Sequence, residues 1–129
     1  MKIEQVGDEY IPVWVDVMVL GEYWKNNISY YVSNWTEEPK SHWFKYDSNG
    51  KRISFITGNM SLAQNDEMPF ISFTSGLHRT RWIMSVNKKH IPVGIKEENY
   101  AYALRIGLAI TRVTKNEAII IPNNAGVLD

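Results

Sequence analysis

The residues best suited to chemistry stand together in one run, Thr74-Ser75-Gly76-Leu77-His78-Arg79-Thr80-Arg81. A strand pattern, Ile71 to Phe73, enters the run, and apolar residues at helical spacing follow it. Gly76 can adopt backbone angles closed to other residues and lets a ligand approach the main chain. The first N–H groups of a helix have no intrahelical partner and attract an anion, most often a phosphate. The run therefore predicts a phosphate-binding turn between a strand and a helix.

The side chains of the run could hold the same phosphate. Arg79 could form a two-pronged pair with phosphate oxygens. His78 could donate a hydrogen bond when protonated or act as a general base when neutral. Each cation at a helix N-terminus destabilises the helix by about 0.3–1 kcal/mol. An anionic partner would explain why several cationic side chains stand there. The alternative is that Arg79 pairs with an acidic side chain of the fold and Arg81 is merely solvated. The predicted phosphate ligands are Thr74, Ser75, Gly76, His78, Arg79, Thr80 and Arg81.

A second candidate site is the aromatic segment between Trp14 and Phe44. Trp35 and Trp43 stand in a polar stretch, where an exposed ring could dock a protein partner or stack on a base. The alternative is that these rings fill the core of a small domain. Both interpretations stay open for Trp35 and Trp43, whereas Trp14 and Trp82 are predicted to lie in the core.

Basic side chains also gather in Lys88-Lys89-His90, with Lys96 nearby. They could make a weak contact with nucleic acid, although such a cluster at a helix C-terminus more often complements the helix dipole.

No metal site is predicted, because His42, His78 and His90 lack the regular spacing of zinc ligands. A Mg²⁺ ion carried by a nucleotide would need a carboxylate near the glycine turn. Asp66 and Glu67 are the closest in the sequence.

Several elements must position these residues. Alternating β-branched residues predict a strand over 10–20, ended by Gly21, with a short helical turn over 22–27 and a strand or irregular segment over 28–32. Residues 51–57 are assigned to a helix rather than a strand. Two strands, 60–64 and 68–73, predict a hairpin around a polar turn at 65–67.

The second half of the chain continues in the same mixed way. Helices are predicted over 77–88 and 97–106, the second with Tyr100, Ala103 and Leu104 facing inward and Gly107 as its C-cap. A short buried strand, 91–95, separates them. Strands over 108–113 and 118–121 predict a closing hairpin, and the tail from Pro122 is predicted to fray.

Composition limits the class of protein. The 129 residues fit one α+β domain, 1–129, with a mixed sheet and two or three helices. The 14 basic and 14 acidic side chains balance, which excludes a bulk polycation that binds nucleic acid by charge alone. The absence of cysteine excludes disulfides and a cysteine nucleophile. The chain has no long apolar run and no signal-peptide pattern at its start, so we expect a cytoplasmic protein without membrane insertion.

The run from Met68 to Trp82, followed by His90-Ile91-Pro92-Val93, resembles the core box of the ParB/sulfiredoxin-like superfamily. The form Ser-Phe-Thr-x-Gly-x-His-Arg before a Trp-bearing helix is most similar to the plasmid fertility inhibition factors, which suppress transfer of another element. The match covers 68–95, and the strand around Trp14 and the neighbouring Trp24 fit more loosely.

The resemblance implies a nucleotide site, because ParB domains bind a nucleoside triphosphate and sulfiredoxins bind ATP at this box. It assigns phosphate contact to Gly76, His78 and Arg79, with Ser75 and Thr80 as lesser candidates, and it implies ATP or another NTP with Mg²⁺. Sulfiredoxin chemistry is excluded, since the attacking cysteine would fall at Leu77. The chain also has no room for the helix-turn-helix module of a partition protein. Ser75 and Leu77 replace polar or charged residues that the fertility inhibitors carry, which reduces the polar reach of the pocket.

Two hypotheses about function follow. The first is an inhibitory binding protein of a mobile genetic element, a plasmid or phage. It would act on a protein component of a conjugation or host-defence machine. The second is a ParB-like NTPase or nuclease with His78 and Arg79 as catalytic residues. The first is preferred, because the sequence holds no metal or base constellation that an enzyme of this kind would need.

Overall fold

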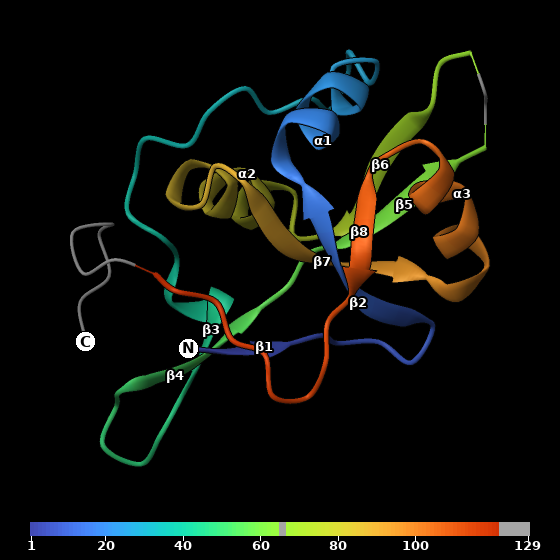
Figure 1. Cartoon of the computed structure of the whole chain (residues 1–129). Helices are drawn as coiled ribbons and strands as arrows, with labels where there is room; N and C mark the ends of the chain where they lie inside the picture. The colour runs from blue at the N-terminus through green and yellow to red at the C-terminus, as the bar shows by residue number, and fades with distance from the viewer. Residues whose placement is uncertain (65–66, 122–129) are drawn as a thin grey trace.

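The computed structural model describes residues 1–64 and 67–121. Within them, strands form a five-stranded mixed sheet, in the order β6-β5-β7-β2-β8, and a three-stranded sheet, in the order β1-β4-β3. Figure 1 shows both sheets with the helices α1, α2 and α3 around them. This arrangement confirms the predicted α+β class.

The centre of the larger sheet is β2 (Tyr10–Asp16), which pairs antiparallel with β7 (His90–Lys96) on one side and with β8 (Ala109–Arg112) on the other. The strand predicted to run to Leu20 ends at Asp16 instead. The Asp16 carboxylate accepts a hydrogen bond from the Val19 N–H at 3.0 Å and so caps helix α1 (Val17–Trp24). A capping side chain thus overrides the β-branched pattern of the following residues.

The hairpin predicted before the glycine turn is confirmed. β5 (Asn59–Ala63) pairs antiparallel with β6 (Phe70–Ser75), and the tip at 65–66 lies outside the described residues. β5 also runs parallel to β7, pairing at Asn59 and Gly94. The hairpin thereby joins the edge of the sheet to its centre.

The smaller sheet contains the largest error in the predicted elements. Residues 51–57, assigned to a helix, form β4 (Arg52–Ile56). It pairs parallel with β1 (Lys2–Glu4) and antiparallel with β3 (Phe44–Tyr46), two strands that were not predicted. A short 3₁₀ turn, η1 (Ser41–Trp43), leads into β3. The seven residues 51–57 carry too few periods to separate helix from strand, so pairing with the neighbouring β3 and the distant β1 decides their conformation.

The predicted closing hairpin is half wrong. β8 forms as expected, but Ala118 bridges to Lys2 rather than to β8, and the Ile119 N–H donates to the Met1 carbonyl at 2.9 Å. The second arm therefore fastens the start of the chain. The predicted fraying from Pro122 falls outside the described residues.

The helices after the glycine turn follow the prediction with one change. α2 (Leu77–Val86) is confirmed, whereas the helix over 97–106 divides into a 3₁₀ turn, η2 (Glu97–Asn99), and α3 (Tyr100–Arg105). The buried residues of α3 are Tyr102 and Ala103. Leu104, which was predicted to face inward, is 42% exposed. Gly107 has a positive φ of 75°, in keeping with its predicted place at the helix end.

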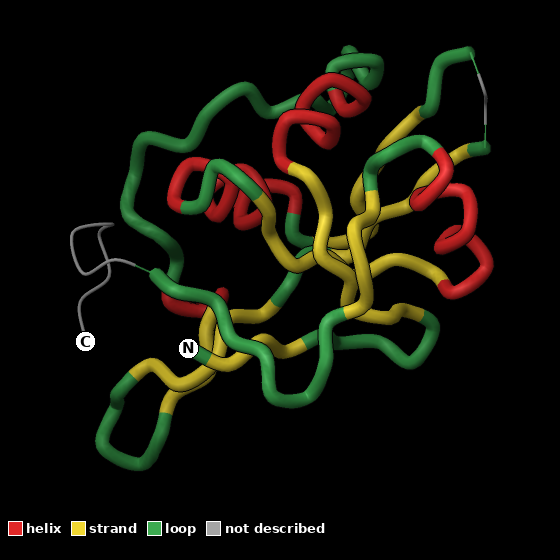
Figure 2. Tube along the Cα trace, viewed as in Figure 1, coloured by secondary structure: helices red, strands yellow, loops and turns green. Residues whose placement is uncertain are grey.

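Figure 2 shows the helices against the two sheets, and buried side chains of α1, α2 and both sheets form one core cluster. The Trp82 ring on α2 packs against Phe44 of β3 and Phe55 of β4, with centroid distances of 5.6 and 5.9 Å. Ile83 of the same helix is also buried. The smaller sheet thus holds α2 in place, and with it the turn that precedes the helix.

Candidate functional site

The predicted glycine turn is formed as the sequence indicates. Gly76 lies between β6 and α2 as the N-cap residue, with φ 81° and ψ 28°, in the left-handed region that favours glycine. Thr80 holds this turn closed, because its N–H and its hydroxyl both donate to the Gly76 carbonyl, at 2.9 and 2.6 Å. Thr80 is buried. It therefore shapes the turn rather than reaching a ligand.

A second glycine, Gly58 between β4 and β5, lies directly against this turn. A Cβ added to Gly76 would lie 2.5 Å from the Gly58 Cα, and one added to Gly58 would lie 2.9 Å from the Gly76 carbonyl oxygen. The Gly94 N–H donates to the Gly58 carbonyl at 2.8 Å and ties the contact to β7. Gly58 was not predicted as part of the site, although a lone glycine between two short apolar runs is a signal of close backbone approach.

Arg79 lies in the first turn of α2 with its guanidinium beside the glycine turn, since a Cβ on Gly76 would lie 2.6 Å from the Arg79 Nε. The Nε is buried and has no hydrogen-bond partner. Within residues 1–64 and 67–121, no carboxylate forms an ion pair with this side chain. Burial lowers the pKa of Arg79, because desolvation penalises its charged form. The described acidic residues thus do not supply the partner that the alternative interpretation of Arg79 requires.

His78 and Trp35 meet at the same helix end. The exposed His78 ring lies 5.5 Å from the Trp35 ring, and the Lys40 Nζ lies 5.7 Å from the Trp35 centroid. The Trp35 N–H donates to the Glu38 carbonyl at 3.3 Å. The segment 33–43 therefore brings a half-buried indole and a lysine next to the predicted phosphate site, a proximity that sequence spacing does not reveal.

The other predicted ligands are placed less directly. Ser75 is exposed at the end of β6. The Thr74 hydroxyl lies 2.9 Å from the Tyr10 hydroxyl and donates to the Asn59 carbonyl at 3.3 Å. Arg81 has its guanidinium 6.0 Å from the Tyr31 ring and 3.7 Å from the Met84 sulfur, so other contacts engage it.

The tryptophans divide between core and surface. Trp14 and Trp82 are buried, which confirms their prediction as core residues. Trp43 is 4% exposed and packs against Trp82 at 5.9 Å. Burial removes the Trp43 ring from direct contact with a partner, which corrects its place in the predicted docking surface. Trp35, 5.1 Å from Trp43, covers it from outside.

The basic cluster lies at the opposite end of α2. Lys88 and Lys89 are exposed between α2 and β7, and His90 is exposed at the start of β7. The His90 ring lies 5.0 Å from the Trp14 ring, edge-on. The Lys96 ammonium lies 3.8 Å from a Glu9 carboxylate oxygen. The structure therefore does not bring this cluster to the glycine turn.

Of the two carboxylates considered for Mg²⁺, only Glu67 belongs to the described residues, and it lies away from the turn. Asp66 lies outside the described residues, and Glu67 precedes β6, whose length of roughly 16 Å separates it from Gly76. Among the residues that the structure describes, no group of three or more His, Asp or Glu side chains could hold a metal ion. A phosphate fits the unpartnered Arg79, and a Mg²⁺ ion would have to arrive with the nucleotide.

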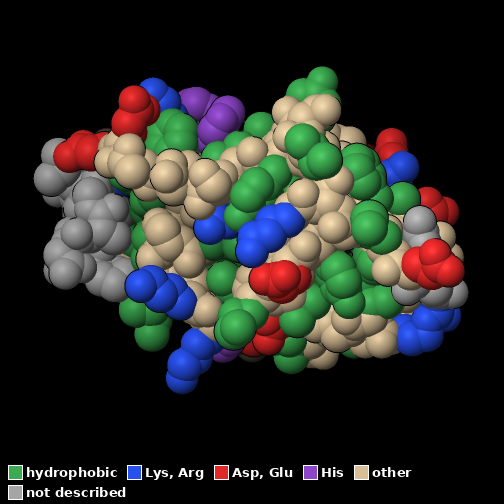
Figure 3. Space-filling view, turned by 90° about the horizontal axis from the view of Figure 1, so that it is seen from above, with side chains coloured by type: hydrophobic (Ala, Val, Ile, Leu, Met, Phe, Trp, Pro, Cys, Tyr) green, Lys and Arg blue, Asp and Glu red, His purple; other side chains and the backbone are tan. Residues whose placement is uncertain are grey.

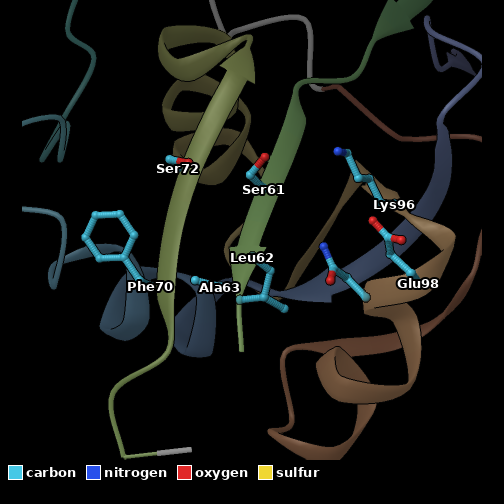
Figure 4. A pocket seen from close by; sticks show the side chains of 8 residues that line it. Ser61, Leu62, Ala63, Phe70, Ser72, Lys96 and Glu98 are labelled. Atoms are coloured by element: carbon cyan, nitrogen blue, oxygen red, sulfur yellow. The ribbon is translucent and has the colours of Figure 1, made fainter. Parts of the chain in front are cut away.

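A separate groove of about 300 Å³ lies against the β5–β6 hairpin (Figure 4). Phe70 and Ser72 of β6 face it from one side, and Lys96 and Glu98 from the other. None of the predicted phosphate ligands lines it. The residues that line the groove are Ser61, Leu62, Ala63, Phe70, Ser72, Lys96, Glu98 and Asn99.

These features define a class: a small α+β domain with a strand–glycine–helix turn and an unpaired arginine at its mouth. One solved structure with a similar fold is the crystal structure of the oncogenic suppression activity protein, a plasmid fertility inhibition factor, as a gold(I) cyanide derivative. The TM-score is 0.51 at 14% identity, over 83% of this chain. The alignment spans 61% of the length of that protein. At this identity the likeness shows a shared fold.

No protein-family model matches the chain. No curated protein matches it either. The fold relationship to a fertility inhibition factor agrees with the predicted resemblance, and the wider ParB/sulfiredoxin-like assignment stays a prediction. None of the helices in the described part of the chain has the length and apolar character needed to cross a membrane.

Proposed function

We propose that this chain is an inhibitory binding protein of a mobile genetic element, of the fertility-inhibition kind. It acts in the cytoplasm on a protein component of a conjugation or host-defence machine. It binds a phosphate-bearing ligand, ATP or another NTP, at the turn between β6 and α2. The fold likeness supports the class of protein, and the geometry of the turn supports the ligand.

The main support for a phosphate ligand is that the buried Nε of Arg79 has no hydrogen-bond partner. A half-buried guanidinium whose Nε lacks a hydrogen bond is costly, because a desolvated charge needs a compensating partner. A phosphate at the mouth of the turn would supply it. The free N–H groups of the first turn of α2 and the exposed hydroxyl of Ser75 would add hydrogen bonds to the same anion.

The proposed partner surface adjoins the same turn. Trp35 presents a half-buried indole with Lys40 over it and His78 beside it. Tryptophan is enriched among the residues that carry most of the binding energy at protein interfaces. Ligand binding at Arg79 and partner docking at Trp35 would therefore be linked through His78, which contacts Trp35 and precedes Arg79 in α2.

A second candidate function is phosphoryl transfer or nucleic-acid cleavage. His78 is exposed and directly precedes Arg79 in the first turn of α2, which favours this second function. A general base and a cation that stabilises negative charge would then share one helical turn. Under this alternative, His78→Ala abolishes turnover of ATP or DNA while leaving the binding of pyrophosphate intact.

Conjugative transfer tests the proposed function. The chain is expressed in donor cells that carry a self-transmissible plasmid, and transfer frequency is measured for wild type, Trp35→Ala and the exposed control Lys51→Ala. We expect inhibition by wild type and by the control, and loss of most inhibition with Trp35→Ala at equal protein level. Full inhibition by Trp35→Ala would reject the surface. If the wild-type chain leaves the transfer frequency of a whole panel of such plasmids unchanged, the proposal that it acts on a conjugation machine is rejected.

A further inference from the structure

The outward face of α1 carries side chains that the proposed site does not use. Met18, Glu22 and Lys25 are exposed and follow one another at spacings of four and three residues, so they lie along one stripe of the helix surface. Ile28 stands in the turn after the helix. Along the chain, the order of these four side chains is apolar, acidic, basic, apolar.

Met18, at the start of the stripe, and Ile28, in the turn beyond the helix, are unusually open to solvent. Met18 is 78% exposed and Ile28 is 91% exposed, and the nearby Tyr30 is also exposed. Figure 3 looks down on the side of the molecule where α1 lies in Figure 1, and shows hydrophobic side chains around adjoining basic and acidic ones. Large apolar side chains gathered on one face mark an interaction surface.

The packing of α1 within its own chain does not need this stripe. Leu20 and Trp24, on the other side of the helix, are fully buried and attach α1 to the core. An outward helix face is normally polar, so Met18 breaks the amphipathic pattern. The Glu22–Lys25 pair, 3.3 Å apart and well exposed, stabilises a single chain very little.

The stripe is complementary to itself when its direction is reversed. In an antiparallel pair of α1 helices, Met18 of one copy meets Ile28 of the other, and Glu22 meets Lys25. A twofold axis near residue 23 forms each contact twice, as isologous dimer interfaces require. We propose that α1 is a dimerisation helix, and that the occupant of this face is a second copy of the same chain.

Sedimentation velocity between about 10 μM and 1 mM, a range that covers weak association, tests the proposal. We expect a reversible monomer–dimer equilibrium. Met18→Lys raises the dimer Kd at least about tenfold, because the twofold axis repeats the loss of apolar contact. Glu22→Lys and Lys25→Glu each raise it about three- to tenfold, because each places like charges across the interface twice.

A mixture of the two charge-reversed proteins gives the sharpest result. Glu22→Lys supplies only basic side chains to the stripe and Lys25→Glu only acidic ones, so an equimolar mixture restores opposite charges at both positions. The mixture should associate more tightly than either variant alone. Glu37→Lys is the matched control, because Glu37 and Lys40 form an exposed pair with the same spacing outside α1. It should leave the Kd unchanged.

Three results would overturn the proposal: a monomer throughout the concentration range, a dimer insensitive to Met18→Lys and to both charge reversals, or a mixture no tighter than its components. The altered side chains are exposed, so the variants should fold. Circular dichroism on each variant verifies this point before the comparison is made.

Discussion

At the scale of single residues, two glycines and one arginine define the candidate site. Gly76 needs its positive φ to turn the chain from β6 into α2, and its Cα lies against Gly58. Arg79 folds back over the same turn with an unpartnered Nε. The close contact between the Gly58 and Gly76 backbones fixes the turn. In this turn the Arg79 Nε has no hydrogen-bond partner within the described part of the chain.

Gly76→Ala tests the contact against a matched control. Gly50 has nearly the same φ, 78° against 81°, but no atom lies within 4 Å of a Cβ added there. We expect Gly50→Ala to lower the free energy of unfolding by about 1 kcal/mol, the cost of a left-handed alanine. Gly76→Ala adds a clash with the Gly58 backbone and should cost about 3 kcal/mol. Equal losses in urea unfolding would show that the two loops can separate freely.

At the scale of elements, the sequence predicts best where local signals and tertiary structure agree. The β5–β6 hairpin, the glycine turn, α2 and β7 were all predicted, because apolar periodicity and turn residues lie within one continuous stretch. β1 was missed because its partner β4 lies about 50 residues away in the sequence. β4 was misassigned although its other partner, β3, is close in the sequence, because its own residues are too few to show a period. The meeting of Trp35 with His78 depends on the same kind of long-range packing.

The turn after β8 gives a prediction about acid stability. Glu117 accepts hydrogen bonds from the Thr114 N–H at 2.8 Å and the Trp14 indole N–H at 2.9 Å. The Thr114 N–H is the main reason that the pKa of Glu117 lies below its ordinary value of 4.5, and nearby His90 lowers it further. A pKa lowered by folding stabilises the protein above the unfolded-state pKa, and the effect is lost as pH falls through the folded pKa.

Glu117→Gln isolates this contribution. We expect the variant to be less stable than wild type at pH 7 in urea unfolding, and the difference to shrink as pH falls below about 4.5. Other titrating groups are common to both proteins and cancel in the difference. A difference that stays constant from pH 7 to pH 3 would contradict the ionised role of Glu117.

At the scale of the whole molecule, the two sheets hold α2 between them. The aromatic rings of Trp43, Phe44, Phe55 and Trp82 join the smaller sheet to that helix. Trp35 lies outside this cluster and connects it to His78 at the site. These contacting aromatic rings therefore run from the core, at Phe44 and Phe55, to the candidate docking surface at Trp35.

Paired tryptophan variants test this division. Trp43→Ala removes a buried ring and should lower the free energy of unfolding by about 3–5 kcal/mol. Trp35→Ala removes a half-buried ring and should lower it by about 1 kcal/mol. Chemical denaturation of both proteins measures the difference. Comparable losses would place Trp35 in the core and remove it from the docking surface.

Ligand-dependent thermal unfolding shows whether the turn at Gly76 binds phosphate through Arg79, as we propose. Wild type, Arg79→Ala and the control Arg81→Ala are titrated with pyrophosphate, ATP, CTP and GTP, with and without Mg²⁺. A ligand at 100 times its Kd stabilises the fold by about 2.7 kcal/mol, a Tm rise of several degrees. We predict this rise for wild type and Arg81→Ala, and its loss in Arg79→Ala. No rise with any ligand, or an equal rise in Arg79→Ala, would contradict the claim.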